Sequence, residues 1–248
     1  MKKSSKIYNA FRNGETLSLS RFIFLCLYEK DHGYYQKNRI GTDFITAPEI
    51  SQLFGECVSI FIASINERIG KIRDFCELGP GNGTLIKDLS KNLNTLIKEE
   101  LNFFLFEKSN SFVKNIKTNI KNVNISHLKK LIFPKRPIFF IANEFFDALP
   151  INQFEKTANG WLERRIDLVE GKLKLTLKKN PFFKFSEKQS KKGDIDEISP
   201  YAKLYLERIF SHLNKFGGGL LIFDYGPLKK KKIDTIQSIF KKKKKLFS

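Results

Sequence analysis

The chain of 248 residues has few of the residues that most often bind transition metals, with three cysteines and three histidines. Cys26, Cys57 and Cys76 lie far apart and have no C-x-x-C spacing, which excludes a structural zinc site. Their odd number and apolar surroundings favour reduced, buried thiols. We therefore expect no metal centre and a cytoplasmic location.

Long apolar runs are also missing. The longest, Phe22 to Tyr28, has seven residues, whereas a membrane-spanning helix needs about 20. Residues 1–11 contain lysines but no apolar segment of signal-peptide length. With 41% hydrophobic and 29% charged residues, the composition is typical of a globular protein, and we expect no membrane partner.

Acidic residues are outnumbered, 26 against 45 Lys and Arg, which gives a net charge of +19. Residues 229–248 carry nine Lys and one Asp, and basic residues elsewhere are scattered. A nucleic-acid binder instead gathers positive charge on one face and interleaves aromatic residues. The joint abundance of Lys, Asn, Ile and Phe is typical of an AT-rich genome, so we expect no specific nucleic-acid partner.

Residues 71–150 alternate between short apolar segments and amphipathic segments of helical period. The expected strands are Ile72–Leu78, Asn102–Phe106, Val123–Ser126 and Pro137–Ala142, with helices over 84–98 and 110–119. Continuously hydrophobic strands that alternate with helices predict an α/β fold, with a parallel sheet covered by helices on both faces.

Residues 1–70 are expected to form an N-terminal helical extension that acts as a lid. One helix covers 17–29, with Ser18 as its cap, and a longer one begins at the capping box Thr46-Ala47-Pro48-Glu49. The apolar stripe of this longer helix consists of Ile50, Leu53, Phe54, Cys57, Val58, Phe61 and Ile65.

The pattern changes after residue 150. Residues 151–198 are expected to form an antiparallel β meander insert that contacts the substrate, with strands over 151–156, 161–169 and 173–178 and a loop over 180–196. Residues 199–228 return to the core with a helix that ends at Phe216 and a fifth strand, Leu220–Phe223. Residues 229–248 form a basic tail of low complexity.

The strongest motif is Glu77-Leu78-Gly79-Pro80-Gly81-Asn82-Gly83, between a strand and a helix. Glycines let a ligand approach the backbone closely, and the helix N-terminus offers free N–H groups. A dinucleotide fingerprint, G-x-G-x-x-G, needs glycine at Thr84. G-x-G-x-G after an acid is the pattern of S-adenosylmethionine (SAM) sites, and Glu107, at the end of the second strand, can bind both ribose hydroxyls. The alternative is a glycine-rich turn without a ligand.

A second motif, Ala142 to Pro150 (ANEFFDALP), follows the fourth strand, where the order of a doubly wound sheet reverses. Glu144 and Asp147 lie three residues apart with two Phe between them, which suits a cationic substrate between aromatic walls. We assign Glu144, Asp147 and Asn143 to the reaction. The alternative is that the aromatic residues belong to the core and the acids to a solvated turn.

These motifs, with Gly41 to Glu56 (GTDFITAPEISQLFGE), resemble the MidA-type SAM-dependent methyltransferases, bacterial relatives of a mitochondrial complex I assembly factor. Further matches are Arg21-Phe22, Tyr28, His32 to Tyr35, Trp161 to Arg165, Glu197 to Pro200, and Phe223 to Gly226. The resemblance extends over about residues 17–239. It implies a class I, Rossmann-like methyltransferase fold and methylation of a protein arginine, with a respiratory-complex subunit as a candidate substrate.

We assign Glu77 and Glu107 to the cofactor and expect the segment that begins at Thr46 and contains Pro48 to cover it; the alternative for Thr46 is a plain helix cap. The glycines of the turn, Gly79, Gly81 and Gly83, complete this set. Family members continue beyond residues 234–237, whereas this chain runs into five lysines and Leu246-Phe247-Ser248. We therefore expect a C-terminally truncated member in which the fifth strand is an exposed apolar edge that promotes self-association.

The sequence is also compatible with two other functions. A nucleic-acid methyltransferase is compatible with the basic charge, but it would carry an aromatic base pocket such as N-P-P-Y after the fourth strand, where this chain has N-E-F-F-D. A non-enzymatic assembly chaperone could keep the same fold and use residues 151–178 as a docking surface.

Overall fold

The computed structural model describes most of the chain. The described residues are 6–11, 14–30, 33–37, 45–70, 72–121, 123–183, 185, 190–226, 232–236, 238–240 and 243–245. His32, residues 41–44 of the GTDF segment and residues 246–248 lie outside them.

The chain divides into two compact units. One combines the described residues of 1–37, 149–203 and 226–248, and the other those of 38–148 and 204–225. Residues 1–70, which we expected to form one N-terminal extension, thus contribute to both units. The reason is that their first strand and helix pack against the antiparallel sheet, as described below.

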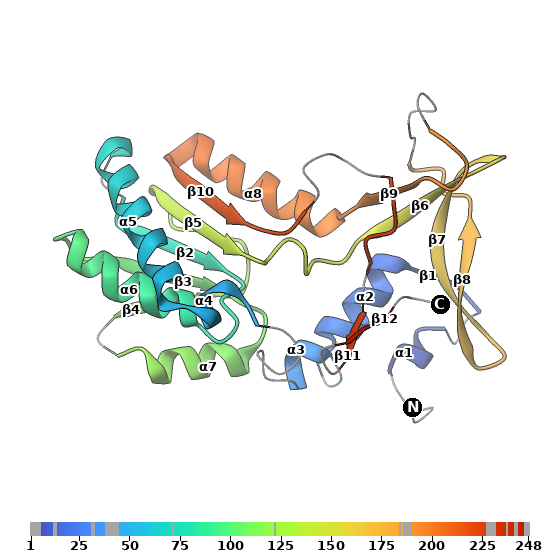
Figure 1. The fold of residues 1–248 in the computed structure, drawn as a ribbon, viewed down its shortest axis with the longest axis horizontal. Coiled ribbons are helices and arrows are strands. Elements are labelled where there is room, and N and C mark those ends of the chain that lie inside the picture. Colours follow the sequence, from blue (N-terminus) through green and yellow to red (C-terminus); the bar gives the residue numbers. More distant parts are fainter. Residues whose placement is uncertain are drawn as a thin grey trace. The chain divides into compact units, whose positions relative to one another are not determined.

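The unit with residues 38–148 is built on a five-stranded parallel sheet (Figure 1). Its strands, in the order of the sheet, are β10 (Gly218–Phe223), β5 (Ile138–Asn143), β2 (Asp74–Leu78), β3 (Asn102–Phe106) and β4 (Asn124–Leu128). The predicted parallel sheet is confirmed, and the order of its strands reverses between β2 and β5. This reversal opens a crevice at the carboxyl ends of the strands, where ligands of such folds bind.

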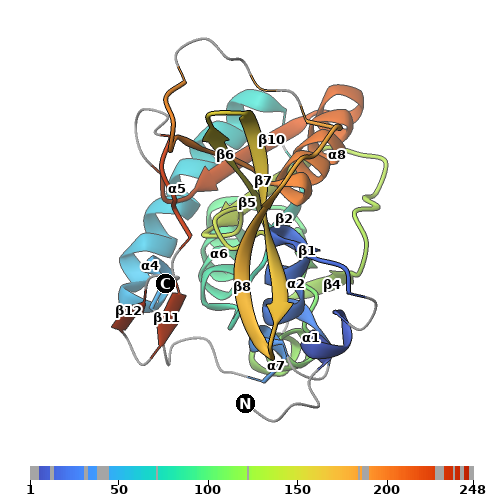
Figure 2. The same ribbon diagram turned by 90° about the vertical axis from the view of Figure 1, so that its right-hand side faces the viewer.

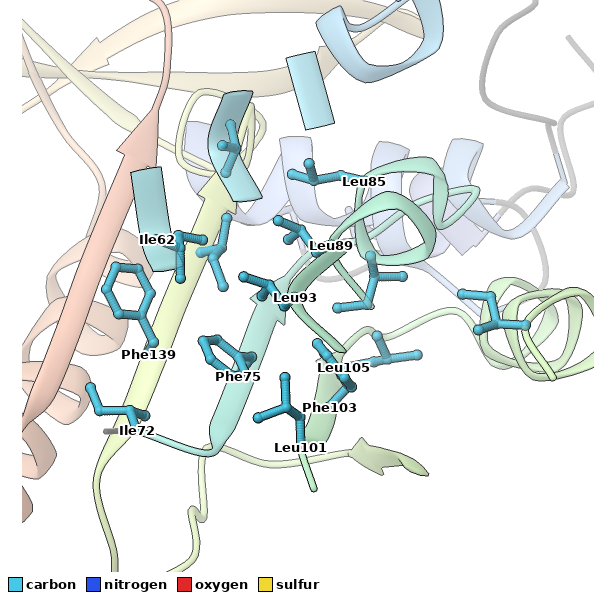
Figure 3. Packing of buried hydrophobic residues seen from close by; sticks show 14 of the residues in the cluster. Ile62, Ile72, Phe75, Leu85, Leu89, Leu93, Leu101, Phe103, Leu105 and Phe139 are labelled. Atoms are coloured by element: carbon cyan, nitrogen blue, oxygen red, sulfur yellow. The ribbon is translucent and has the colours of Figure 1, made fainter. Parts of the chain in front are cut away.

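Helices cover both faces of this sheet, as predicted. On one face lie α5 (Gln52–Ile69), α6 (Thr84–Leu96) and α7 (Asn110–Asn119), and on the other α8 (Pro200–Phe216). Successive side chains along each strand point to opposite faces of the sheet. Phe75, Phe103 and Phe139 pack among leucines and isoleucines of the first group of helices (Figure 3), whereas Phe106 and Phe140 contact rings of α8.

The helix that we expected to begin at Thr46 is two helices, α4 (Ala47–Ile50) and α5. They are separated by Ser51, whose extended backbone (φ −151°) breaks the helix and whose hydroxyl accepts the Leu53 N–H. The Thr46 N–H donates to the Glu49 carboxylate at 3.2 Å, as expected from the capping box.

The predicted stripe of α4 and α5 is only partly buried. Of its residues Val58 is buried, but Ile50, Leu53 and Phe61 are 74%, 63% and 46% exposed, and Cys57 is exposed as well. Ile62, which is fully buried, was not part of the predicted stripe. The buried face is centred elsewhere because Gly55 lets α6 pack closely: a Cβ at Gly55 would lie 2.6 Å from the Cβ of Asp88. The expectation that all three thiols are buried is therefore wrong for Cys57.

The other unit contains the antiparallel sheet predicted after residue 150 (Figure 2). Its strands are β6 (Asn152–Thr157), β7 (Gly160–Val169), β8 (Lys172–Lys178), β9 (Ile195–Ile198) and β1 (Leu17–Ser18). β7 pairs with β6, β8 and β1, and β9 pairs with β6. Two of these strands, β1 and β9, were not predicted; we expected a helix start at residue 17 and a loop through 196.

The helices of this unit are α1 (Lys6–Asn9), α2 (Leu19–Tyr28) and α3 (Tyr34–Lys37). Ser18 caps α2 by accepting the Arg21 N–H, as predicted, and Leu19 and Phe22 of α2 pack against Ile166 of β7. In the basic tail, β11 (Ser238–Phe240) pairs with β12 (Lys243–Lys245). In the part of the chain that the structure describes, no helix is both long and apolar enough to cross a bilayer.

Several of the sequence motifs that resemble the MidA-type family form a polar network within this unit. The Arg164 guanidinium donates to the carboxylates of Glu155 and Asp234. Glu197 accepts the Thr235 hydroxyl and one N–H of the buried Gln153 amide. The Gln153 amide also donates to Asp234. These bonds attach residues 232–236 to β6, β7 and β9, so the motifs around Arg164 and Glu197 have a structural role.

Candidate functional site

The glycine-rich turn joins β2 to α6 at the carboxyl edge of the parallel sheet. Gly79, Gly81 and Gly83 have φ angles of +65°, +53° and +83°, in the left-handed region that favours glycine. A Cβ at Gly79 would lie 2.6 Å from Cδ2 of Phe145, and one at Gly83 would lie 2.5 Å from Cγ1 of Ile116. All three positions therefore favour glycine because of their backbone conformation. At Gly79 and Gly83 the packing of neighbouring side chains also leaves no room for a Cβ.

Glu107 lies at this turn, as predicted. It follows β3, and its carboxylate accepts the Ser109 N–H at 2.8 Å and also the N–H groups of Lys108 and Gly81. Burial raises the pKa of Glu107, and the backbone donors partly offset that rise. The bond from Gly81 places this carboxylate directly beside the turn.

Glu77 is buried beneath the turn, at the end of β2, and is only 3% exposed. Burial, together with the charge of Glu107, raises its pKa to about 8, although the Ile86 N–H opposes the rise. Among the described residues its Oε2 has no hydrogen-bond partner. A buried carboxyl oxygen without a partner is costly, and a cationic ligand at the turn would stabilise its ionised form.

The start of α4 is attached to the same turn. The Asn82 side-chain amide donates to Glu49 at 2.6 Å, and the other oxygen of Glu49 accepts the Thr46 N–H. The buried Pro48 and the residues Asn82 and Gly83 line an open hollow of about 470 Å³ between α4, α6 and α7. Its volume is within the range of small-ligand sites, but neither Glu107 nor Glu77 lines it. The hollow therefore lies next to the glycine-rich turn and does not include the two acids assigned to the cofactor.

The predicted catalytic segment leaves β5 beside β10. Asn143, half-buried, is the last residue of β5, and Glu144 follows it in the left-handed region with φ +49°. The Glu144 N–H donates to the Phe223 carbonyl at 2.8 Å, and its carboxylate accepts the Ala47 N–H of α4. These bonds bring Glu144 and the start of α4 together.

Three carboxylates cluster at this point. Partial desolvation raises the pKa of Asp147 to about 6, with further contributions from the charges of Asp224 and Glu144. The pKa of Glu144 is also raised, first by desolvation and then by the charges of Asp224 and Glu49. Repulsion within the cluster favours a cation as its ligand.

Of the two aromatic residues between these acids, Phe145 differs from the substrate wall that we expected. The Phe145 ring stacks on Tyr205 of α8, meets Phe106 edge-on and fills the space at Gly79. It is therefore packed against the α8 face of the sheet and does not form a wall of the substrate site. Phe146 is half-buried against Phe145, so the expected pair of aromatic walls is wrong at Phe145.

Comparison with known proteins places the chain in a family. A family model described as "Putative S-adenosyl-L-methionine-dependent methyltransferase" matches residues 57–247. The chain belongs to this methyltransferase family.

Similar proteins within and around this methyltransferase family agree with that assignment. The mitochondrial protein arginine methyltransferase NDUFAF7 of Xenopus laevis is 30% identical over 87% of the chain and 58% of its own length, and that of Homo sapiens is 32% identical over 78% and 52%. A COG1565 superfamily protein from Burkholderia thailandensis, solved bound to S-adenosyl-homocysteine, superposes with a TM-score of 0.79 at 22% identity, over 97% of this chain and 68% of that one. The chain thus spans between half and three fifths of these NDUFAF7 proteins, and the solved structure establishes the shared fold.

Four residues of this methyltransferase family member joined the site without having been assigned to it: Glu49, Asn82, Asp224 and Tyr225. Asp224 accepts two backbone N–H groups of the segment that contains Asp147, and the Tyr225 hydroxyl donates to Glu144. The signal that could have identified Asp224 and Tyr225 is their position directly after the fifth parallel strand, at the same edge as Glu144.

Proposed function

We propose that this protein transfers a methyl group from SAM to an arginine side chain of another protein. The observation that carries this proposal is the hydrogen bond from the Gly81 N–H to Glu107, because it puts the acid for the ribose at the glycine-rich turn. The unpartnered buried oxygen of Glu77 fits a cationic cofactor as well. Membership of the methyltransferase family and the names of the mitochondrial relatives support the same reaction.

The cofactor would be held by backbone and carboxyl groups. Gly79, Gly81 and Gly83 would allow close approach to the backbone, Glu107 would accept both ribose hydroxyls, and Glu77 would face the positive charge. The first turn of α4, with Thr46 and Pro48, would cover the turn, since Glu49 already bonds Asn82. SAM, when bound, supplies a methyl group on a sulfonium that is activated for in-line displacement.

The acidic cluster would bind and deprotonate the substrate. A guanidinium group has a pKa above about 12 and is a poor nucleophile while it is protonated. Glu144 and Asp147 would hold this cation by charge-assisted hydrogen bonds, with Asn143 as a further polar contact. As the new N–C bond forms and the S–C bond of the sulfonium breaks to leave a neutral thioether, one N–H proton would pass to a carboxylate. Asp147, with its pKa raised to about 6, can accept this proton near neutral pH.

The same acids disfavour a nucleic-acid substrate, because phosphates would lie beside carboxylates. We retain a respiratory-complex subunit as the candidate substrate on the basis of the resemblance alone.

We also propose that a second copy of this chain pairs along β10. Among the described residues this strand ends the sheet; it carries no charge or proline that would protect an edge, and the exposed fraction of Ile222 is 41%. Ile222→Lys should then lower the association measured by light scattering after size-exclusion chromatography. A wild-type protein that stays monomeric at all concentrations would contradict the pairing.

The reaction can be tested with methyl-labelled SAM and a cell lysate, with and without nuclease. The proposal predicts nuclease-resistant label that is recovered as methylarginine after acid hydrolysis, and loss of this label in Glu144→Gln. An exposed change of the same type, Glu67→Gln, should keep it. Label that disappears with nuclease treatment, or no label from a protein that binds SAM, would refute the proposed substrate.

A further inference from the structure

One acid at this site has no role in the reaction as proposed so far. Asp224 is the first residue after β10. Because β10 and β5 are parallel and Phe223 lies opposite Asn143, Asp224 and Glu144 leave neighbouring strands at the same level. The register of the sheet therefore fixes Asp224 beside the predicted catalytic segment.

The contacts of Asp224 are made to the backbone of that segment. Its Oδ2 accepts the Phe146 N–H at 2.8 Å and the Asp147 N–H at 3.3 Å, while its Oδ1 accepts the Tyr225 N–H at 2.9 Å. One carboxylate thus satisfies two consecutive backbone donors in the irregular segment that follows β5. Charge-assisted bonds of this kind are stronger than neutral ones.

The segment needs such support because its entry is strained. Glu144 has a left-handed φ of +49°, a conformation that costs a non-glycine residue about 1 kcal/mol. The next residue, Phe145, is fixed between Gly79 and Tyr205. Phe145 is held by packing, and the N–H groups of Phe146 and Asp147 are held by Asp224. These contacts fix the backbone that carries Glu144 and Asp147.

The charges around the two acids come from three elements. Glu144 is faced by Asp224 and Tyr225 after β10, by Glu49 of α4 and, within its own segment, by Asp147. Asp147 is faced by Asp224 and Glu144. The charge of Asp224 therefore adds to the negative field at both.

We propose that Asp224 is a positioning residue: its carboxylate holds the Glu144–Asp147 segment through the Phe146 and Asp147 N–H groups and sets the charge that both acids present to a cationic substrate. The second part of this proposal rests on the proposed function. The first part can be tested without SAM or a substrate, so the two can fail separately.

Two substitutions separate the backbone role of Asp224 from its charge. Asp224→Asn keeps an oxygen acceptor and removes the charge, whereas Asp224→Ala removes both. The titration of the Asp147 carboxyl carbon is followed by NMR in protein labelled with ¹³C-aspartate and assigned with Asp147→Asn. Amide hydrogen exchange of Phe146 and Asp147 reports the backbone contacts, and Glu67→Gln, an exposed acid on α5, serves as the charge-matched control.

In the wild-type protein Asp147 should titrate near pH 6 with both amides protected. Asp224→Asn should lower this midpoint by about one pH unit and keep the amides protected, and Asp224→Ala should also accelerate their exchange by about tenfold or more. The acid limb of methyl transfer should move to lower pH with Asp224→Asn, a change that a purely structural role would not cause. An unchanged Asp147 midpoint in Asp224→Asn, or protected amides in Asp224→Ala, would overturn the proposal.

Discussion

Replacing Glu77 with glutamine should make the cofactor-free protein more stable at neutral pH. Glu77 is buried, and its pKa is raised from 4.5 to about 8. Between these two values the unfolded chain loses the proton of Glu77 while the folded protein keeps it. The stability of the wild-type protein therefore falls by about 1.4 kcal/mol per pH unit across this range, which amounts to about 3 kcal/mol at pH 7.

The assay is urea unfolding of wild-type and Glu77→Gln protein at several pH values from 4.5 to 9. The difference in unfolding free energy should grow with pH up to about 8 and then stay constant, since both states are ionised above it. Glu67→Gln, an exposed acid on α5, should show no such growth. Parallel stability profiles for wild type and Glu77→Gln would refute the account of Glu77 as a buried, unpartnered acid.

Three further predictions follow from the same site. Gly79→Ala should lower stability by about 2–4 kcal/mol in urea unfolding, because it combines a left-handed φ with a clash against Phe145; a change below 0.5 kcal/mol would contradict this. Glu144→Ala should bind SAM in calorimetry but lose methyl transfer, and loss of both would place Glu144 in the cofactor site instead. Methyl transfer should rise as the pH increases through about 6, where Asp147 ionises; a rate independent of pH from 5 to 8 would exclude that role.

Local patterns were sufficient to predict the parallel core. The segments Asn102–Phe106 and Asn110–Asn119 were predicted with their observed bounds, because uninterrupted apolar residues and clear helix signals leave few alternatives. The turn at Gly79 was equally predictable, since its glycines are required by the local backbone. The position of Glu107 beside that turn followed from the rule that parallel strands end at the same edge.

Features that depend on distant partners were not predictable in this way. β9 has no strong strand pattern of its own and forms by pairing with β6. The buried face of α5 is set by the close approach of α6 at Gly55, which hydrophobic periodicity alone does not encode. Asp224 belongs to the site only because β10 is adjacent to β5, 75 residues or more away along the chain.

Binding of SAM to the purified protein tests the central claim most directly. Calorimetry should show saturable binding to the wild-type protein and none to Gly81→Val, whose side chain would occupy the turn in a left-handed conformation. Gly171→Val, which places the same strain in the turn between β7 and β8, should bind like the wild type. A wild-type protein that does not bind SAM, or a Gly81→Val protein that binds it undiminished, would contradict the assignment of the glycine-rich turn.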